Sequence, residues 1–501
     1  MIKLSHTNAI ARLSKPGFQE ITSLIFRRYP DHEWATFARF GWRDTEDGLV
    51  ITLASIDSPY PEDMNELVGH VQIREPYTLR VALSAENHPL AVGVIHSHPE
   101  NCLPIPSSID DDMDGYYARY FNDFACGRPY VSLIFSKMTG DLVLSGRIYW
   151  QATWRGIETF VVETVPTTTW RGNKGYAQPP KVHGRTARLN NAFGIEAASR
   201  LRRATVAVIG AGGTGSAVVE VLVRAGVGKL ILVDPDHIEE SNLERVHGSQ
   251  PSHARDAVPK VEVARKHALS IDPNCQVEPI VGRLPQAEVV NAVIRADIAI
   301  GCTDQQHSRL ALSDLAVRYL LPAIDCGVLL EGQAGNISAL VIQIVRFLSF
   351  DPCALCRGMI IPRTISQELM SANERKLRQE EAERALMRGE NPHQYWHREA
   401  QIDTVGFLTT TAGAMAAGYA IGWLSGRFEP PFSQLQMNLI AQYFDVTNTV
   451  QTPRQECACH RIRGFADQAA GDAFVSPPTH WPPAQRIRVP DTSRKETSDE
   501  K

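Results

Sequence analysis

The sequence has no long apolar run and no excess of positive charge. No stretch of about 18 consecutive apolar residues occurs, although a membrane-spanning helix would need one. The first residues, MIKLSHTNAIARLSKPGF, lack the apolar segment of a signal peptide. The formal net charge of −5 does not indicate a nucleic-acid-binding surface. We therefore expect a cytoplasmic protein that binds neither a membrane nor nucleic acid.

Cysteine is sparse and odd in number, and no internal repeat is visible. The nine cysteines are scattered through 501 residues, so without a secretion signal we expect reduced thiols rather than a disulfide framework. The hydrophobic fraction of 43% and the charged fraction of 21% are those of an ordinary globular protein. A chain of this length is expected to form two or three domains.

The order of apolar and polar segments predicts an α/β protein with two folded units. Residues 1–160 are expected to form a small mixed α/β unit, and the polar stretch 161–184 is expected to be a linker. Residues 185–465 repeat a strand, a turn and a helix, which predicts a doubly wound, Rossmann-like parallel sheet. Within this unit 363–400 is a charged helical insertion, and after it 466–501 is expected to be a disordered tail.

Two histidines separated by one residue follow an apolar strand in VGVIHSHP. Alternate residues of a strand point to the same side, so His96 and His98 can face one point. Asp110, from the helix that follows, would complete a catalytic zinc site with an open position for water. The metal would acidify that water and polarise a carbonyl, and a separate carboxylate would take the proton. Ser107 lies close enough in sequence to donate a hydrogen bond to a developing oxyanion.

These residues resemble the JAMM/MPN+ metalloproteases (Mov34/MPN/PAD-like domains), whose pattern is a distant Glu, then His-x-His-Pro, then Ser-x-x-Asp. Here the spacer between His98 and Ser107 is eight residues, one more than in the family. The longer spacer leaves both Asp110 and Asp111 open as the third ligand, and we prefer Asp110. A degenerate copy that binds no metal is the alternative.

The same resemblance implies a catalytic glutamate on an early strand of the first unit. Glu33 in DHEWATFARFGWR matches that position, and Glu75 and Glu20 match it less well. The resemblance therefore implies a zinc metallopeptidase or isopeptidase in which Glu33 is the general base.

A glycine-rich turn between a strand and a helix, VAVIGAGGTGS, fits a nucleotide-binding loop. Gly210, Gly212 and Gly215 follow the dinucleotide fingerprint, in which glycine permits a tight turn and close approach of the backbone to phosphate. The helix that follows presents its N-terminus to the anion. Asp234 ends the next strand and is placed to bind ribose hydroxyls. These features alone fit NAD as well as ATP.

The residues downstream favour ATP. The segments DPDHIEESNLERVHG, PKVEVARKHALSIDP and GCTDQQHSR resemble, in order and spacing, the ThiF/MoeB family of adenylyltransferases, which activate ubiquitin-like and sulfur-carrier proteins. The resemblance implies that Asp234 binds the ATP ribose and that Asp304 binds Mg²⁺. It also implies that Asn242, Arg245 and Lys260 contact phosphates.

That family also uses an arginine of the partner subunit, placed just before the first strand of the sheet. Arg188 matches this position best, with Arg185 behind it, so the resemblance implies a homodimer. In the family's reaction a carboxylate attacks the α-phosphate and pyrophosphate leaves. Cations then stabilise the charge that accumulates on the phosphate oxygens. A hydride-transferring enzyme would have no use for such a cluster.

Four of the cysteines form two close pairs. DPCALC contains Cys353 and Cys356, and ECACH contains Cys457 and Cys459. Four thiolates in two pairs fit a structural zinc site, and many ThiF/MoeB members carry such pairs. Because the second pair is Cys-x-Cys, His460 is an alternative ligand, and unligated thiols are the other interpretation.

A thioester-forming cysteine is not evident. Family members that form a thioester usually carry the nucleophile after the first cysteine pair, but no cysteine occurs between 357 and 423. Cys302 is expected to be a buried thiol at a strand end. Cys326 in AIDCGV is the one candidate nucleophile, and a buried packing role is the favoured interpretation. The reaction is then expected to stop at the acyl-adenylate or to pass it directly to a thiol of a conjugating-enzyme partner.

Both sets of residues point to one substrate. Adenylation needs a free C-terminal carboxylate, and a JAMM protease produces one from an extended precursor or an isopeptide conjugate. The sequence resembles bacterial fusions of an activating enzyme with a JAMM domain, which act on ubiquitin-like proteins and are associated with antiviral defence. Two alternatives stay open. One is processing and activation of a sulfur carrier for cofactor or metabolite biosynthesis, and the other is an adenylyltransferase whose JAMM unit only binds its partner.

Overall fold

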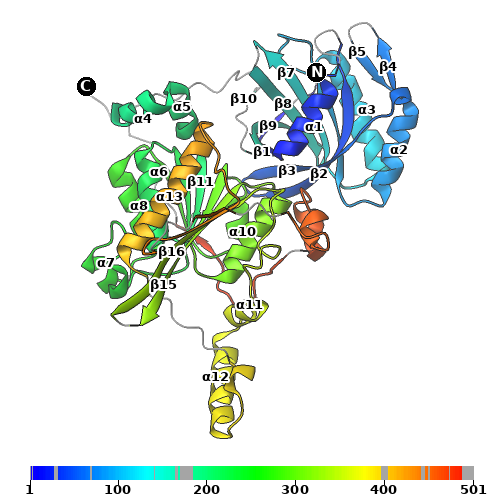
Figure 1. Cartoon of the computed structure of the whole chain (residues 1–501). Coiled ribbons are helices and arrows are strands. Elements are labelled where there is room, and N and C mark those ends of the chain that lie inside the picture. Colours follow the sequence, from blue (N-terminus) through cyan, green and yellow to red (C-terminus); the bar gives the residue numbers. More distant parts are fainter. Residues whose placement is uncertain are drawn as a thin grey trace, which may run out of the picture.

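Two large β-sheets, each with its own helices, and one two-stranded hairpin are found in the computed structural model of the chain (Figure 1). The structure describes residues 2, 4–27, 32–67, 70–139, 141–163, 168–169, 184–333, 335–396, 404–441, 446–448, 452–472 and 474–487. Within these residues, no helix combines the length and apolarity that crossing a bilayer would require.

The first unit contains most of the predicted strands and helices of residues 1–160. Its elements are β1 (Ser5–Leu13), α1 (Lys15–Ile25), β2 (Ala35–Thr45), β3 (Gly48–Asp57), β4 (Met64–Leu67), β5 (His70–Ile73), α2 (Glu75–Glu86), β6 (Ala91–Ser97), α3 (Ser108–Phe124), β7 (Tyr130–Met138), β8 (Asp141–Trp150), β9 (Thr153–Val162) and β10 (Thr168–Thr169). The sheet order is β10-β8-β7-β6-β2-β3-β1-β9, and β8 also pairs with β9, so the two ends of the sheet meet. β4 and β5 form a separate hairpin.

The core of the first unit is aromatic between the sheet and helices α2 and α3. The ring of Phe37 on β2 lies 5.0 Å from Tyr77 of α2 and 5.2 Å from Phe121 of α3, measured between centroids. All three side chains are buried. Such edge and tilted contacts add to the burial of large apolar surfaces, which fixes both helices on the sheet.

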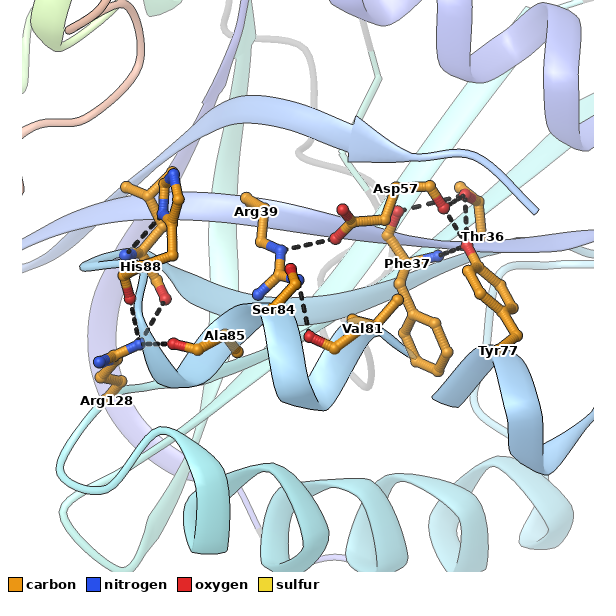
Figure 2. Close-up of polar contacts among 11 residues, drawn as sticks. Thr36, Phe37, Arg39, Asp57, Tyr77, Val81, Ser84, Ala85, His88 and Arg128 are labelled. Carbon is orange, nitrogen blue, oxygen red and sulfur yellow. Dashed lines mark hydrogen bonds and ion pairs between the residues drawn. The ribbon is translucent and has the colours of Figure 1, made fainter. Parts of the chain in front are cut away.

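Buried polar contacts also hold α2 in place (Figure 2). Arg39 of β2 donates from Nε to the Asp57 carboxylate at 2.6 Å and from Nη2 to the carbonyl of Val81 at 2.7 Å. At the C-terminal end of the helix, Arg128 donates to the carbonyl of Ala85 at 2.7 Å. A cation at this end complements the partial negative charge of the last carbonyls. The outward face of α2 therefore has a fixed position.

The second unit confirms the predicted doubly wound sheet. Its longer elements are α4 (Ala187–Phe193), α5 (Ile195–Arg203), β11 (Thr205–Ile209), α6 (Gly213–Arg224), β12 (Lys229–Val233), α7 (Pro251–Arg255), α8 (Lys260–Ile271), β13 (Gln276–Val281), α9 (Ala287–Val293), β14 (Ile298–Gly301), α10 (Gln306–Arg318), β15 (Ala323–Gln333), β16 (Asn336–Phe347), α11 (Pro362–Glu368), α12 (Ala372–Met387), α13 (Gly406–Ser425), β17 (Gln434–Asn438), β18 (Val446–Asn448) and β19 (Gln485–Arg486). Short 3₁₀ helices lie at 184–186, 240–242, 392–394, 458–460 and 467–472.

The strand order places a crevice next to the glycine-rich turn. The sheet runs β18-β17-β16-β15-β14-β11-β12-β13-β19, and β11, β12, β13, β14 and β15 are parallel. The order reverses between β11 and β14, and in such sheets ligands bind at the carboxyl ends of the strands at this point. The parallel strands are buried runs of Val, Ile, Leu and Ala, as expected for a sheet covered on both faces. The charged segment after 363 forms α11 and α12, and α12 projects away from the sheet (Figure 1).

The two units meet around the fully buried side chain of Arg12 on β1. Its guanidinium donates to backbone carbonyls of the second unit: to Ala296 at 2.8 Å, to Ile294 at 3.3 Å and to Leu320 at 3.3 Å. Burial outweighs the nearby acids and lowers the pKa of Arg12 to about 10, so the group stays charged at neutral pH. These hydrogen bonds satisfy three carbonyls that the interface removes from water.

Glu163, directly after β9, is a second buried link between the units. Its carboxylate accepts hydrogen bonds from the backbone and the hydroxyl of Ser349 at 2.7 and 3.0 Å, and from the backbone of Lys15 at 3.1 Å. Burial raises the pKa of Glu163 to about 7 in spite of these hydrogen bonds. The expected linker from residue 161 therefore begins inside the interface, because β9 extends to Val162 and Glu163 packs against the second unit.

The tail differs from the expected disorder between residues 466 and 487. The 3₁₀ helix at 467–472 lies against the first unit, where Trp42 donates from its backbone to Gln468 at 2.7 Å. Further on, β19 pairs with β13, and the ring of Trp481 lies 5.2 Å from that of His307. The composition of the tail predicted disorder, but these few aromatic and backbone contacts fix it. The remaining tail residues, 488–501, lie outside the described residues.

Replacing Arg12 is expected to loosen the interface. Arg12→Met leaves buried carbonyls without donors, so the free energy of unfolding should fall by about 3 kcal/mol, measured by urea denaturation. Lys15→Met is the matched control, because its ion pair with Glu429 is more than a third exposed on both sides and should contribute less than about 1 kcal/mol. Equal losses in the two variants would contradict this assignment.

Stability should fall with rising pH because of Glu163. Its folded-state pKa of about 7 lies above the ordinary value of 4.5, so the neutral carboxyl favours folding below pH 4.5 and this contribution is lost as the pH rises through 7. Over that window the wild type should lose about 3 kcal/mol relative to Glu163→Gln. Urea midpoints measured between pH 5 and 8 test this, and identical pH profiles for the two proteins would refute it.

Candidate functional site

Three of the predicted ligands lie together at the end of β6. The ligand atoms of His96, His98 and Asp110 are all within 4.8 Å of one another. His96 Nε2 lies 3.2 Å from Asp110 Oδ1, and His98 Nε2 lies 3.7 Å from Asp110 Oδ2. The two imidazole rings are 5.2 Å apart, so both face the same point, as the alternation of a strand predicts.

The start of α3 directs Asp110 toward the histidines. Ser107 is the N-cap: its Oγ accepts from the backbone of Asp110 at 3.2 Å, and its own backbone N–H donates to Asp110 Oδ2 at 2.6 Å. This capping box fixes the carboxylate. Asp111, the alternative from the sequence, points elsewhere and pairs with Arg147. The long loop before Ser107 therefore absorbs the extra residue without changing which aspartate meets the histidines.

The donor set fits a divalent cation. His98 Nδ1 donates to the carbonyl of Leu103 at 3.1 Å, which leaves Nε2, 3.7 Å from Asp110 Oδ2, as the ring nitrogen available to a metal. Nε2 of His96 is buried, and although it lies 3.2 Å from Asp110 Oδ1, that contact lacks the geometry of a hydrogen bond. A buried ring nitrogen is costly when it is unpaired, and a metal ion between the three groups would satisfy it. Two histidines and one carboxylate are ligands that zinc accepts.

The charges of this cluster are mutually stabilising. Burial would raise the pKa of Asp110, but the two histidines and Ser107 lower it well below its usual range. Burial would lower the pKa of His98, but its bond to Asp110, the carbonyl of Leu103 and the charge of Glu33 raise it. Asp110 is therefore ionised at neutral pH, as a metal ligand must be.

Strand register places Glu33 beside this cluster. β2 and β6 are antiparallel with Ala35 opposite His96. Continuing the register by two residues puts Glu33 opposite His98, on the same face of the strands. The backbone of Trp34 is fixed there by Ser97, which accepts its N–H at 3.0 Å. A carboxylate is thus available next to the three ligands.

The glycine-rich turn leaves room at the N-terminus of α6. Gly210 has a φ of +97°, and a side chain there would lie 2.7 Å from the carbonyl of Cys302. A side chain at Gly215 would lie 1.8 Å from the carbonyl of Gly210, so neither position accepts another residue. A Cβ at Gly212 would meet nothing within 4 Å, and this N-cap residue makes no side-chain cap. The free amides at this helix end fit a phosphate.

An aspartate and lysine pair lies at the carboxyl end of β12. Asp234 is buried and accepts from the backbones of Ala211 at 2.7 Å and Asp236 at 2.8 Å, so it joins the glycine turn to its own loop. Burial raises the pKa of Asp234. Lys260 Nζ lies 3.0 Å from Asp236 Oδ2, and although burial opposes it, Asp234 and Asp236 raise the pKa of Lys260. The site therefore keeps a cation near the turn.

The other predicted residues surround the turn to different degrees. A Cβ on Gly213 would lie 3.2 Å from the side chain of Arg245, so this arginine covers the start of α6. The turn that contains Asp304 follows β14 and lies against Gly210, and Asp304 is exposed. Asn242 is buried and accepts from the backbone of Glu239 at 3.2 Å, so its side-chain oxygen caps a local turn.

The two arginines before β11 have different surroundings. Arg188 is exposed on α4. Arg185 pairs with the buried Asp272 of its own chain. Both arginines are exposed, and Arg185 is the one that an acid of its own chain holds in an ion pair.

The family model for the ThiF family matches residues 183–460, more than half of the chain. The chain belongs to the ThiF family. We call residues 184–487 the ThiF unit. Its glycine turn, the Asp234 loop and the Asp304 turn lie within the matched region.

Curated relatives match parts of the chain. Adenylyltransferase and sulfurtransferase UBA4 of Yarrowia lipolytica is 36% identical over 143 residues, which is 28% of this chain and 35% of that protein. SAMP-activating enzyme E1 of Haloferax volcanii is 34% identical over 144 residues, 28% of this chain and 52% of that protein. Ubiquitin-like modifier-activating enzyme 5 of Caenorhabditis elegans is 35% identical over 127 residues, 23% of this chain and 29% of that protein. The chain thus spans about a third to a half of their lengths.

The four paired cysteines of the ThiF unit form one cluster. Sγ of Cys353 lies 3.5 Å from that of Cys457, Sγ of Cys356 lies 3.8 Å from that of Cys459, and all four sulfurs lie within 4.8 Å. Burial and the neighbouring thiols raise the pKa of Cys457 to about 11, which shows how strongly the site disfavours uncompensated thiolates. A zinc ion would supply the missing charge. His460 is exposed, so this alternative ligand is not needed.

The two thiols considered as nucleophiles differ in exposure: Cys326 is buried and Cys302 is partly buried. Cys326 is 1% exposed and its Sγ lies 3.4 Å from the carbonyl of Ala412. Burial raises the pKa of Cys326 and of Cys302 far above the ordinary range. Neither thiol has the accessible, ionisable character of a nucleophile, in agreement with the packing role favoured by the sequence.

Several residues of these sites were not found by sequence analysis. Thr409 of α13 lies at the glycine turn, where its Oγ1 would be 2.8 Å from a Cβ on Gly213. Glu368 of α11 caps α10, accepting from the backbones of Gln306 at 2.9 Å and His307 at 2.8 Å. Arg147 of β8 holds Asp111 and Asp114 away from the histidines. No short sequence motif identifies these residues, because each contacts residues that are far from it in the sequence.

Two zinc ions per chain are the expected metal content. Because the histidine and cysteine clusters are separate, His98→Ala should lose one ion and Cys356→Ala the other, as measured by inductively coupled plasma mass spectrometry. Cys356→Ala should also lower the unfolding temperature, because a structural zinc links chain segments. Loss of both ions in either folded variant, or none in the wild type, would contradict the two-site assignment.

Proposed function

We propose that this chain adenylates the C-terminal carboxylate of a ubiquitin-like or sulfur-carrier protein and also hydrolyses a bond that follows this terminus. The observation that carries the proposal is the presence of two separate sites in one chain: the glycine turn with Asp234, Lys260 and Asp304, and the cluster of His96, His98 and Asp110 with Glu33 alongside.

Adenylation needs cations around an α-phosphate and an orienting site for the nucleotide. ATP fits the ThiF unit, because Gly212 leaves open space at the N-terminus of α6. Asp234 would bind the ribose, and Arg245 and Lys260 would bind phosphate oxygens. Asn242 would contribute its amide, and Asp304 would hold Mg²⁺, which supplies positive charge at the phosphates when bound. Membership of the ThiF family supports this reaction.

Hydrolysis needs a base, a water and a polarised carbonyl. A zinc ion on His96, His98 and Asp110 would acidify the water and polarise the carbonyl. Glu33 would accept the proton of the water and return it to the leaving amine. Ser107 Oγ accepts from the backbone of Asp110, and in this proposal its hydroxyl would turn from the Asp110 carboxylate to donate to a developing oxyanion. In this proposal the first unit, residues 1–160, is a JAMM/MPN+-like zinc peptidase or isopeptidase.

The two reactions share one substrate group. Hydrolysis after the terminal residue of a small protein releases the carboxylate that adenylation consumes. The printed names of the relatives mention ubiquitin-like modifier activation, SAMP activation and sulfurtransfer, and we propose a substrate of this class. With Cys326 buried and Cys302 partly buried, the reaction would stop at the acyl-adenylate or pass it directly to a thiol of a conjugating enzyme.

The wider setting follows from the sequence resemblance. We propose a cytoplasmic homodimer in which Arg188 reaches the partner's nucleotide site, in a bacterial modification system that serves antiviral defence. Activation of a sulfur carrier is the second candidate, favoured by the sulfurtransferase names among the relatives.

Two single substitutions should separate the two reactions. Asp304→Ala should lower ATP–pyrophosphate exchange by about 100-fold, because it removes the Mg²⁺ ligand, while cleavage of a tail-extended modifier stays within about twofold of wild type. Glu33→Gln should lower cleavage by about 100-fold and leave exchange unchanged. Both reactions are measured on the full chain with the same modifier.

Asp304→Asn and Glu33→Asp are the conservative controls, and partial recovery is expected in each. If either alanine or glutamine variant, still folded by its urea midpoint, lost both reactions, the two-site proposal would be wrong. If the wild type showed exchange without cleavage, the first unit would be a binding module.

A further inference from the structure

The outward faces of α2 and α3 carry a group of exposed apolar side chains. Leu79 and Leu83 of α2 are 42% and 51% exposed, and Ile109 and Tyr116 of α3 are 59% and 49% exposed. Together with the partly buried Met113 and Tyr120, we call these residues the outer ridge. An apolar surface of this extent normally marks an interaction site.

The outer ridge is continuous across the two helices. On α3, residues 109, 113, 116 and 120 follow the spacing of one helix face, and the rings of Tyr116 and Tyr120 stack at 5.6 Å. α2 and α3 are in contact, and the side chains of Tyr117 and Thr78 lie at that contact. On α2, Leu79 is the residue directly after Thr78, and Leu83 lies one turn further on.

The helices of the outer ridge are fixed on the sheet beneath them, and the ridge itself is not covered by the ThiF unit. Beneath it, Arg39, Tyr77 and Arg128 tie α2 to the sheet (Figure 2). In Figure 1, α2 and α3 lie on the side of the first unit that faces away from the ThiF unit. Surfaces held in one conformation lose little entropy on binding, so the ridge is preorganised for a partner.

The ridge begins at the histidine cluster. Ile109 immediately precedes Asp110, and Tyr116 lies six residues beyond Asp110, about 9 Å further along α3. Three extended residues of a substrate tail span about 10 Å. A tail whose end lies at His96 and His98 would therefore bring the protein it belongs to onto the ridge.

The charges around the ridge restrict the chemistry of the partner. Glu75, Asp112 and Asp123 are exposed on α2 and α3, and Arg119 is the exposed cation of α3. Arg80 is neutralised by Asp63 at 2.5 Å. The fitting surface is therefore apolar with basic residues at its margin. Stable subunit interfaces need about 20–30 residues from each side, so this small patch suits a transient partner better than a second copy of the chain.

We propose that the outer ridge binds the folded body of the modifier whose tail is cut at the histidine cluster, through an apolar patch bordered by basic residues. This inference rests on the proposed hydrolysis. Body and tail are then recognised separately: the ridge sets the affinity for the modifier, and the histidine cluster acts on its tail.

The test compares two substrates of the full chain with its zinc bound. One is the ubiquitin-like protein that supports ATP–pyrophosphate exchange, carrying a C-terminal aminocoumarin amide, and the other is its last five residues with the same amide. Leu83→Ser combined with Tyr116→Ser should raise KM for the whole modifier about tenfold or more, the effect of losing one or two anchor residues. It should leave kcat for the modifier, and kcat/KM for the peptide, unchanged.

Ile337→Ser, on an equally exposed residue of the ThiF unit, is the matched control and should change neither substrate. An unchanged KM for the modifier, or an equal loss for modifier and peptide, would overturn the proposal. A changed molecular mass in sedimentation would also overturn it, because the ridge would then be a contact between copies.

Failure of the proposed hydrolysis is distinguishable. If the wild type cleaves neither substrate, binding of the fluorescently labelled modifier is measured by anisotropy on the same proteins. Loss of binding in the double variant alone supports the ridge, and equal binding to all three proteins refutes it.

Discussion

The relative position of the two sites depends on one buried cation. Arg12 lies in the first sheet, but its guanidinium is enclosed by carbonyls of the ThiF unit, and it has no exposed surface. A buried guanidinium is stable only while its N–H groups donate hydrogen bonds. Any sliding or separation of the two units would break these bonds. Glu163, Ser349 and the backbone of Lys15 form a second fixed point nearby. The surfaces proposed for hydrolysis and for nucleotide binding therefore lie on units that are tied together, so the proposed modifier would have to move from one surface to the other.

Each site solves the problem of buried charge in a different way. At the end of β6, one carboxylate is kept ionised by two imidazoles and a helix N-cap. At the end of β12, one ammonium is kept protonated by two aspartates. The cysteine cluster has four thiols within 4.8 Å of one another. Arg357 and Arg463 are close enough to interact with them electrostatically, and a bound metal would compensate the four thiolates directly. The ligand proposed for each site has the opposite charge to the side chains there: a metal cation for the carboxylate and for the thiolates, and a phosphate for the ammonium.

Features with a short repeat could be predicted from the sequence, and features that depend on distant segments could not. The alternation of His96 and His98, the glycines from 210 to 215 and the spacing of the cysteine pairs are local, and the structure shows each as expected. The sequence left Asp110 and Asp111 open, because successive helix residues differ by 100° in direction and the spacer gave no register. Arg147, 36 residues away, fixes the choice. The carbonyls that accept hydrogen bonds from Arg12 lie 282 to 308 residues further along the chain. The sequence of the nine-residue strand that carries Arg12 contains no pattern that could predict these partners. The prediction of a disordered tail was wrong because composition gives only an average tendency. The ring of Trp481 packs against His307 and Arg283, and β19 pairs with β13.

That short pairing has a consequence for the whole sheet. β13 would otherwise be the last strand of a parallel sheet, with a row of free backbone donors and acceptors at its rim. β19 runs antiparallel along it, and Ile487 donates to the carbonyl of Pro279 at 3.0 Å, so the rim is capped by two residues of chain from the far end of the polypeptide. Open rims of this kind recruit other strands and lead to fibrous aggregation. β19 therefore protects this edge from pairing with the sheet of another chain. The protection exists only after residues 485–487 have paired with β13.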